Sequence, residues 1–394
     1  MLSQKAIDIV KSTAPILADR GVDITTVFYK NLFIAHPELL NFFNHANQKQ
    51  GRQQTALANT VYAAALHIDN LGVLIPAVKQ IAQKHRSLGI KAEHYPIVGK
   101  YLLQAIKEVL GDAATEEIIQ AWADAYGIIA DVFIQMENEM YKEAAEQENG
   151  FSEFKNFKIV DKVIESDIIT SFYLQPEDKS AVPTFIPGQY ITVRLTIPGE
   201  TYLLNRQYSL SQASNQETYR ISVKKEAEMN PNGKASVYLH QDGQIGDIIE
   251  VSSPAGDFYL DLESTRPVAL ISGGVGITPM MSMLDTIAKT TPNRPVTFLH
   301  GSRNKALHAF DNDVRELLST MEDTTYLTLY SDENQMLVKE ILADNVLSDS
   351  DIYVCGPVPF MKAIIQSLYD LGFPENRVHF EFFGPAVSLE LVHV

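Results

Sequence analysis

A glycine-rich segment follows an apolar run in the last third of the chain. Residues 268–272 lead into Gly273-Gly274-Val275-Gly276-Ile277-Thr278-Pro279. Glycines allow the main chain to approach a pyrophosphate closely, and a helix that begins there offers free N–H groups and the positive end of its dipole. The segment predicts a dinucleotide site between a strand and a helix. A glycine-rich turn without a ligand is the alternative, because Gly-X-Gly alone is not specific.

Three other motifs stand in a fixed order around this segment: Pro187-Gly188-Gln189-Tyr190, Arg206-Gln207-Tyr208-Ser209 and Tyr353-Val354-Cys355-Gly356-Pro357. In the second motif, the arginine suits the charge of a pyrophosphate, the tyrosine ring can stack on a flavin, and the serine hydroxyl can bond to the ring edge. The four motifs in this order, with a proline ending the glycine segment, resemble those of the ferredoxin reductase-like family. This family contains FAD- and NAD(P)H-dependent reductases.

The resemblance implies a set of cofactor-binding residues along this half of the chain. They are Tyr190, Arg206, Gln207, Tyr208, Ser209, Gly233, Ser236, Gly274, Val275, Gly276, Ile277, Thr278, Pro279, Phe382, Phe383, Gly384 and Pro385. Gly233 and Ser236 look like the second flavin-phosphate contact, at the start of a short helix. Phe382 stands where some relatives carry cysteine, and the tail 386–394 has no counterpart in the motif. Ser302-Arg303 would favour NADPH if it bound the 2′-phosphate, and a surface Ser-Arg pair is equally compatible with the sequence.

One histidine in the first part of the chain is a candidate metal ligand. His85 lies on the apolar face of a helix predicted over 74–88, together with Ile81 and Ala82. A histidine in such a position is most often a packed core residue, so position alone does not make it a ligand. The order and spacing of several other residues resemble a bacterial globin over 1–147. These residues are Tyr29, Phe43, Gln53, Leu57 and His85.

A globin followed by this reductase resembles the flavohemoglobins, or nitric oxide dioxygenases, over essentially the whole chain. The resemblance implies that His85 binds haem iron, whereas His67 and His94 do not occupy the proximal position. It also implies a catalytic set of Tyr29, Gln53, Tyr95 and Glu137, with the last two behind His85. Lys84 and Glu381 match residues that tune the haem and flavin potentials. From the residues alone, Tyr29 can equally be core packing and Glu137 a solvated glutamate.

The hydrophobic period that must position these residues changes twice along the chain. It is helical through about residue 148, alternates after Gly150, and from Pro267 shows strands alternating with helices. We predict a multidomain protein: an all-α globin domain over 1–147, an antiparallel β-barrel FAD domain over 151–262, and an α/β parallel-sheet NAD(P)-binding domain over 266–394. One long helix is expected to begin near Thr115.

Composition excludes several functional classes. The single cysteine, Cys355, excludes a four-cysteine iron–sulfur cluster and an internal disulfide, so electrons from a flavin must reach haem directly. A net charge of −17 argues against nucleic-acid binding. Charged residues near the N-terminus leave no apolar core for a signal peptide. The uncharged run 267–284 is nearly long enough to span a membrane, but the glycines within it make it a poor helix. We therefore expect a soluble cytoplasmic protein.

The resemblance implies an enzyme with haem b, FAD and NAD(P)H. Hydride would pass from NAD(P)H to FAD, electrons would pass singly to haem iron, and the ferrous-oxy haem would convert nitric oxide to nitrate. Expected partners are oxygen, nitric oxide and NAD(P)H, with no nucleic acid, stable membrane association or obligate protein partner. Two alternatives stay open: a gas-binding or sensing globin whose reductase keeps iron ferrous, and a ferric or quinone reductase whose globin stores oxygen.

Overall fold

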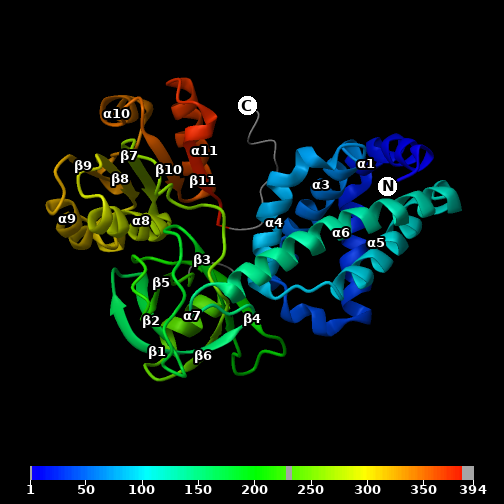
Figure 1. Ribbon diagram of the computed structural model, residues 1–394, viewed down its shortest axis with the longest axis horizontal. Helices are drawn as coiled ribbons and strands as arrows, with labels where there is room; N and C mark the ends of the chain where they lie inside the picture. The colour runs from blue at the N-terminus through cyan, green and yellow to red at the C-terminus, as the bar shows by residue number, and fades with distance from the viewer. Residues whose placement is uncertain (1, 228–232, 384–394) are drawn as a thin grey trace. The chain divides into compact units, whose positions relative to one another are not determined.

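The computed structural model describes residues 2–227 and 233–383 (Figure 1). The chain divides into two compact units, each of which is described by itself. One unit contains the residues up to Glu146 together with Thr196–Asn205, and the other contains the rest of the described chain. The predicted order of all-α, antiparallel β and parallel α/β structure is confirmed.

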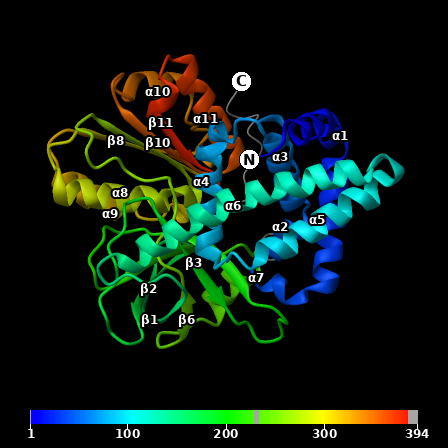
Figure 2. The ribbon, with the colours of Figure 1, turned by 45° about the vertical axis from the view of Figure 1, so that its right-hand side comes forward.

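The first unit is built from helices that pack on a shared apolar core. Its main helices are α1 (Gln4–Ala35), α2 (His45–Lys49), α3 (Arg52–Leu66), α4 (Ile75–Leu88), α5 (His94–Leu110) and α6 (Glu116–Glu146). Helix α1 packs against α3, α5 and α6, and α4 packs against α6. Figure 2 shows α5 and α6 lying alongside each other. The helix predicted near Thr115 begins at Glu116, where the Thr115 hydroxyl accepts a hydrogen bond from the Ile118 N–H.

An antiparallel sheet follows the helices along the chain. Its strands are β1 (Lys155–Ile164), β2 (Ile169–Pro176), β3 (Tyr190–Leu195), β4 (Leu204–Ser209), β5 (Tyr219–Lys224) and β6 (Ile248–Val251), in the order β4-β3-β6-β1-β2-β5. Just after β4, Leu210 bridges to Ile221 in β5, so the two edge strands meet and the sheet closes as a barrel. Helix α7 (Lys234–Gln241) lies in the connection from β5 to β6.

The parallel sheet follows. Its strands are β7 (Val268–Gly273), β8 (Val296–Ser302), β9 (Thr324–Tyr330), β10 (Asp351–Cys355) and β11 (Val378–Glu381), in the order β11-β10-β7-β8-β9. Its helices are α8 (Ile277–Thr290), α9 (Asp311–Ser319), α10 (Lys339–Asn345) and α11 (Val358–Asp370). Figure 1 shows α8 and α9 on one face of the sheet and α10 and α11 on the other. All six residues of β7 are buried, so this central strand appears in the sequence as a continuous apolar run.

Helix α8 begins earlier than expected. The sequence predicts it from Met280, whereas it starts at Ile277 directly after a short 3₁₀ turn over Gly274–Gly276. The Thr278 hydroxyl donates to the Val275 carbonyl oxygen at 3.1 Å, which joins the turn to the helix. The glycine segment therefore passes into a helix without an intervening loop. No helix within 2–227 or 233–383 is long and apolar enough to cross a membrane.

The contact between α5 and α6 depends on a glycine. A Cβ on Gly99 would lie 2.4 Å from the Tyr126 ring, so we expect Gly99→Ala to lower the free energy of unfolding by about 1–3 kcal/mol through overpacking. Gly127 is the matched control, because a Cβ there would meet nothing within 4 Å. Since alanine favours a helix over glycine, Gly127→Ala should leave stability unchanged or raise it. Urea titration of both variants tests this, and equal midpoints would contradict it.

Candidate functional site

Three helices bring a histidine, a tyrosine and a glutamate together. The His85 Nδ1 atom lies 2.8 Å from Glu137 Oε1 and 3.2 Å from the Tyr95 hydroxyl. The Tyr95 hydroxyl donates to the same carboxylate oxygen at 2.6 Å, and the Glu137 side chain is only 2% exposed. With Nδ1–H donated to the carboxylate, Nε2 carries the free lone pair of the ring and has no partner within the described chain. This is the arrangement of an oriented imidazole ligand for a metal.

Main-chain contacts hold this group in place. The Tyr126 hydroxyl donates to the Tyr95 carbonyl oxygen at 2.7 Å, and the Tyr141 hydroxyl donates to the Ile90 carbonyl oxygen beyond the end of α4. Burial, with the Glu137 charge as a second cause, raises the pKa of Tyr95 above its ordinary value. Tyr95 therefore stays a hydrogen-bond donor at neutral pH. The geometry excludes the solvated glutamate that the sequence left open for Glu137.

The residues predicted for the distal side lie on α1 and α3. Tyr29 is 7% exposed and its ring contacts Phe28, Phe33 and Phe43, with ring centres 4.8, 5.7 and 5.7 Å away. Burial raises the pKa of Tyr29, so its hydroxyl remains protonated. That hydroxyl has no hydrogen-bond partner among residues 2–227 and 233–383. Gln53 stands in the first turn of α3, where its Oε1 accepts from Gln48 Nε2.

The other two histidines considered as haem-iron ligands, His67 and His94, have different surroundings. His67 caps the C-terminal end of α3 and is exposed. His94 Nδ1 accepts from the Lys91 N–H at 2.9 Å, and its ring packs against Phe42. Lys84, the predicted tuning residue, precedes His85 on α4 and is half-buried. The residues of the helical unit thus fit a haem, with His85 Nε2 and the Tyr29 hydroxyl as polar atoms left for it.

The candidate flavin residues lie on β3, β4 and the start of α7. Burial raises the pKa of Tyr208 to about 12 and lowers the pKa of Arg206, so the phenol stays neutral and the guanidinium stays charged. The Ser236 hydroxyl donates to the Gly233 carbonyl oxygen at 2.9 Å and accepts from the Glu226 N–H. These bonds fix the turn that starts α7. The other predicted flavin contacts are placed in the same strands: Tyr190 in β3, and Gln207 and Ser209 in β4.

The glycine segment packs main chain against main chain with the Cys355-Gly356-Pro357 loop. A Cβ on Gly276 would lie 2.2 Å from the Cys355 carbonyl oxygen, and one on Gly356 would lie 3.1 Å from the Gly273 nitrogen. Gly274 has a φ of +53° and faces open space. Gly276 is therefore required by loop packing, whereas Gly274 leaves room for a phosphate. Val275, Ile277, Thr278 and Pro279 complete this turn and the first turn of α8.

The C-terminal residues of the candidate site are only partly described. Glu381 ends β11 beside Cys355, whose sulfur points to the Glu381 carbonyl oxygen at 3.6 Å. Cys355 is fully buried, and burial raises the pKa of its thiol. Phe382 packs against the apolar core that includes the buried residues of α11, whereas Phe383 is 45% exposed. Gly384 and Pro385, with the tail 386–394, lie outside the described residues.

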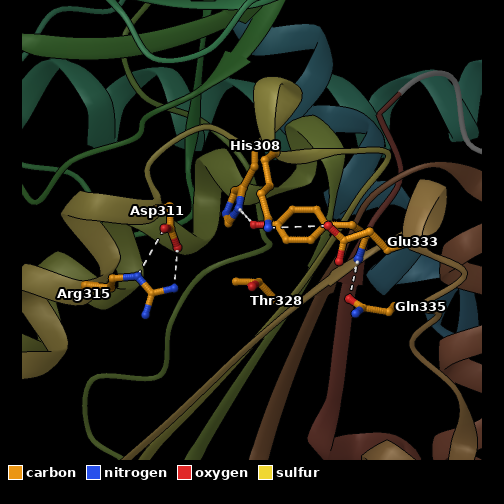
Figure 3. A pocket seen from close by; sticks show the side chains of 8 residues that line it. His308, Asp311, Arg315, Thr328, Glu333 and Gln335 are labelled. Atoms are coloured by element: carbon orange, nitrogen blue, oxygen red, sulfur yellow. Dashed lines mark hydrogen bonds and ion pairs between the residues drawn. The ribbon is translucent and has the colours of Figure 1, made fainter.

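A polar pocket of about 420 Å³ lies at the carboxyl ends of β8 and β9 (Figure 3). It is lined by Lys305, His308, Asp311, Arg315, Thr328, Tyr330, Glu333 and Gln335. Lys305 pairs with Glu333 at 3.4 Å, and Arg315 with Asp311 at 3.1 Å. Ser302 and Arg303 do not line it, and the Ser302 hydroxyl donates to the Asn304 carbonyl oxygen. The motifs of the sequence do not identify these residues; their only signal is a position at or beyond the carboxyl ends of two strands of a parallel sheet.

Family models match three successive parts of the chain. The globin model matches residues 26–133, the oxidoreductase FAD-binding domain 156–259, and the oxidoreductase NAD-binding domain 270–366. The chain is 56% identical to a flavohemoprotein of Bacillus cereus and 49% identical to one of Bacillus subtilis, with 99% of this chain covered in both cases and 100% and 99% of those proteins. The chain belongs to the flavohemoprotein family.

Solved structures agree with the flavohemoprotein assignment. A flavohemoglobin of Malassezia yamatoensis with bound FAD and haem superposes with a TM-score of 0.87 at 26% identity, over 97% of this chain and 100% of that one. The FAD- and NAD-binding part of a Vibrio cholerae nitric oxide dioxygenase is 39% identical over 59% of this chain and 100% of its own, with a TM-score of 0.56. The predicted family and fold class are confirmed.

A histidine stack beside the pocket should make this flavohemoprotein sensitive to acid. The His300 and His308 rings stack with centres 4.4 Å apart, and burial lowers the pKa of His300 to about 3. Below pH 6.5 the unfolded chain protonates His300 while the folded chain does not, so stability should fall toward pH 3 by up to about 1.4 kcal/mol per pH unit. His300→Asn should flatten this dependence, measured as melting temperature against pH. The exposed His67→Asn is the control, and equal slopes in parent and His300→Asn would contradict the argument.

Proposed function

We propose that this flavohemoprotein is an NAD(P)H-dependent nitric oxide dioxygenase, an oxidoreductase that combines nitric oxide with oxygen to give nitrate and so detoxifies nitric oxide. The observation that carries the proposal is the His85–Glu137–Tyr95 group in a chain that also contains FAD- and NAD-binding domains. The haem would supply the iron at which oxygen reacts, and the FAD would divide the two-electron hydride of the nicotinamide into single electrons.

The proximal residues would set the electron density of the iron ligand. A buried carboxylate that accepts from Nδ1–H would give the His85 imidazole partly anionic character, so the Nε2 lone pair would bind iron more strongly. The Tyr95 hydroxyl holds that carboxylate by a second hydrogen bond. Glu137 thus remains directed at His85 rather than at solvent. Lys84 and Glu381 are proposed to tune the haem and flavin potentials.

The distal residues would hold the oxygen and exclude water. Tyr29 offers a protonated hydroxyl among the rings of Phe33 and Phe43, and such an apolar surrounding strengthens a hydrogen bond. Gln53 would be the second donor, from the first turn of α3. Both roles require only that a donor faces the haem ligand.

We further propose domains over 1–147, 151–262 and 266–394, matching the changes of hydrophobic period. The flavin would lie on the residues of β3, β4 and α7 described above, and the nicotinamide cofactor at the glycine segment. Phe382 and Phe383, with Gly384 and Pro385, would close over the nicotinamide. We propose a cytoplasmic protein that acts on oxygen, nitric oxide and NAD(P)H without nucleic acid, stable membrane association or an obligate protein partner.

The polar pocket of Figure 3 would receive the adenosine end of the nicotinamide cofactor. It lies at the carboxyl ends of β8, which neighbours β7, and of β9 beyond it, and α/β sheets bind nucleotides at the carboxyl ends of their strands. Its two cations are already paired with carboxylates, so a 2′-phosphate would meet Asp311 and Glu333 as well as Lys305 and Arg315. The pocket therefore gives NADPH little advantage over NADH.

The dioxygenase activity is tested by nitric oxide loss and nitrate formation in air with NADH. We expect His85→Ala to abolish turnover, and Tyr29→Phe to lower it about 10- to 100-fold by removing one hydrogen bond to a developing charge. Tyr62→Phe, on α3, is the matched control and should keep the parent rate. Unchanged turnover in His85→Ala would contradict the proposed mechanism. A parent that binds gas without multiple turnovers would favour the gas-binding alternative.

The nicotinamide pocket is tested by comparing kcat/KM for NADPH and NADH. We expect Glu333→Gln to raise the NADPH to NADH ratio about fivefold, because it removes one negative charge near the phosphate and releases Lys305. Glu340→Gln, on an exposed residue of α10 outside the pocket, should leave the ratio at the parent value. An unchanged ratio in Glu333→Gln would place the adenosine end elsewhere.

A further inference from the structure

Three glutamine side chains form a hydrogen-bonded row between α2 and α3. Gln54 Nε2 donates to the Gln48 main-chain oxygen at 3.1 Å and to Gln48 Oε1 at 3.3 Å. Gln48 Nε2 in turn donates to Gln53 Oε1 at 3.0 Å. All three side chains are half-buried. The row ends at Gln53, one of the two proposed distal donors.

The direction of this row is set by a group that can only accept. A main-chain carbonyl has no proton to give, so the Gln54 amide must present its nitrogen to it. Gln54 Oε1 is then left buried without a hydrogen-bond partner in the described chain, a cost that the reversed amide would exchange for a contact between two acceptors. The Gln48 amide must therefore turn its oxygen to Gln54 and its nitrogen to Gln53. This holds Gln53 Oε1 as an acceptor toward Gln48 and turns the two N–H groups of Gln53 away from Gln48 as donors.

A second contact anchors the row to α1. The Thr25 hydroxyl donates to the Gln54 main-chain oxygen at 2.9 Å, and Thr25 is 1% exposed. Thr25 lies one turn before Tyr29 on α1. The start of α3, which carries Gln53, is thus tied to the helix that carries the other distal donor.

We propose that Gln48 is a positioning residue, which holds the Gln53 amide with its nitrogen toward the haem ligand. The inference rests on the proposed function, because it takes Gln53 as a distal residue. A neutral glutamine that rotated freely would offer its oxygen as often as its nitrogen, and an oxygen facing a partly negative ligand would repel it. Gln48 removes that choice before any ligand arrives.

The full-length protein loaded with haem and FAD allows a direct test. Two readouts report the distal donor independently of turnover: the C–O stretching frequency of the carbon monoxide adduct, and the oxygen dissociation rate. Gln53→Leu should raise both the C–O stretching frequency and the oxygen dissociation rate. Gln48→Leu should raise both as well, the dissociation rate by about three- to tenfold. Gln48→Glu keeps the shape and the acceptor for Gln54 but cannot donate to Gln53, so it should also raise both. The double variant Gln48→Leu/Gln53→Leu should equal Gln53→Leu.

The controls separate this inference from the proposed function. Gln50→Leu changes an exposed glutamine of the same segment and should match the parent in both readouts. Parent values in Gln48→Leu and Gln48→Glu, alongside a changed Gln53→Leu, would overturn the positioning role and leave the dioxygenase proposal intact. Parent values in Gln53→Leu itself would overturn the distal assignment of Gln53 and this inference with it. A parent protein that shows no nitric oxide turnover would instead count against the proposed function.

Discussion

The burial of one carboxylate constrains the whole helical unit. An ionised glutamate removed from water costs several kcal/mol unless other groups satisfy it, and Glu137 is 2% exposed on α6. Its partners come from two other helices, His85 on α4 and Tyr95 on α5. Three helices must therefore keep their relative positions for the carboxylate to be tolerated. The same bonds orient the imidazole, so the hydrogen bonds that satisfy the buried carboxylate also aim the proposed haem ligand.

Hydrogen-bond direction is the second theme of the helical unit. Carboxylates and main-chain carbonyls can only accept, so each defines which way a neighbouring side chain must point. Glu137 does this for the ring of His85, and the Gln48 main-chain oxygen does it for the amides that lead to Gln53. The two sides of the proposed haem site are thus organised by the same rule, through acceptors on different helices.

In the α/β region, close packing of one main-chain segment on another shapes the candidate dinucleotide site. Gly276 and Gly356 bring the ends of β7 and β10 together, so closely at Gly276 that a Cβ would collide with the Cys355 carbonyl group. Gly274, by contrast, faces open space with a positive φ. Neighbouring glycines in one motif therefore meet different needs: Gly276 allows two loops to pack, and Gly274 leaves the surface clear for the proposed cofactor. Beyond them, paired charges at the ends of β8 and β9 make a polar pocket without a strong net charge.

The sequence alone determined the architecture, because hydrophobic period and turn chemistry are local properties. The short strand-like runs 190–195 and 248–251 predict β3 and β6 with the bounds that the structure has, and the order of motifs points to the family. Tertiary structure decided what depends on distant partners. No alternating pattern in the sequence marks β2, because six of its eight residues are buried. The proposed roles of Gln48 and Glu333 arise from contacts between separate elements. The reason for Gly276 is a loop 79 residues further along, at Cys355. A linear pattern records which residues can do chemistry, whereas folding decides which of them meet.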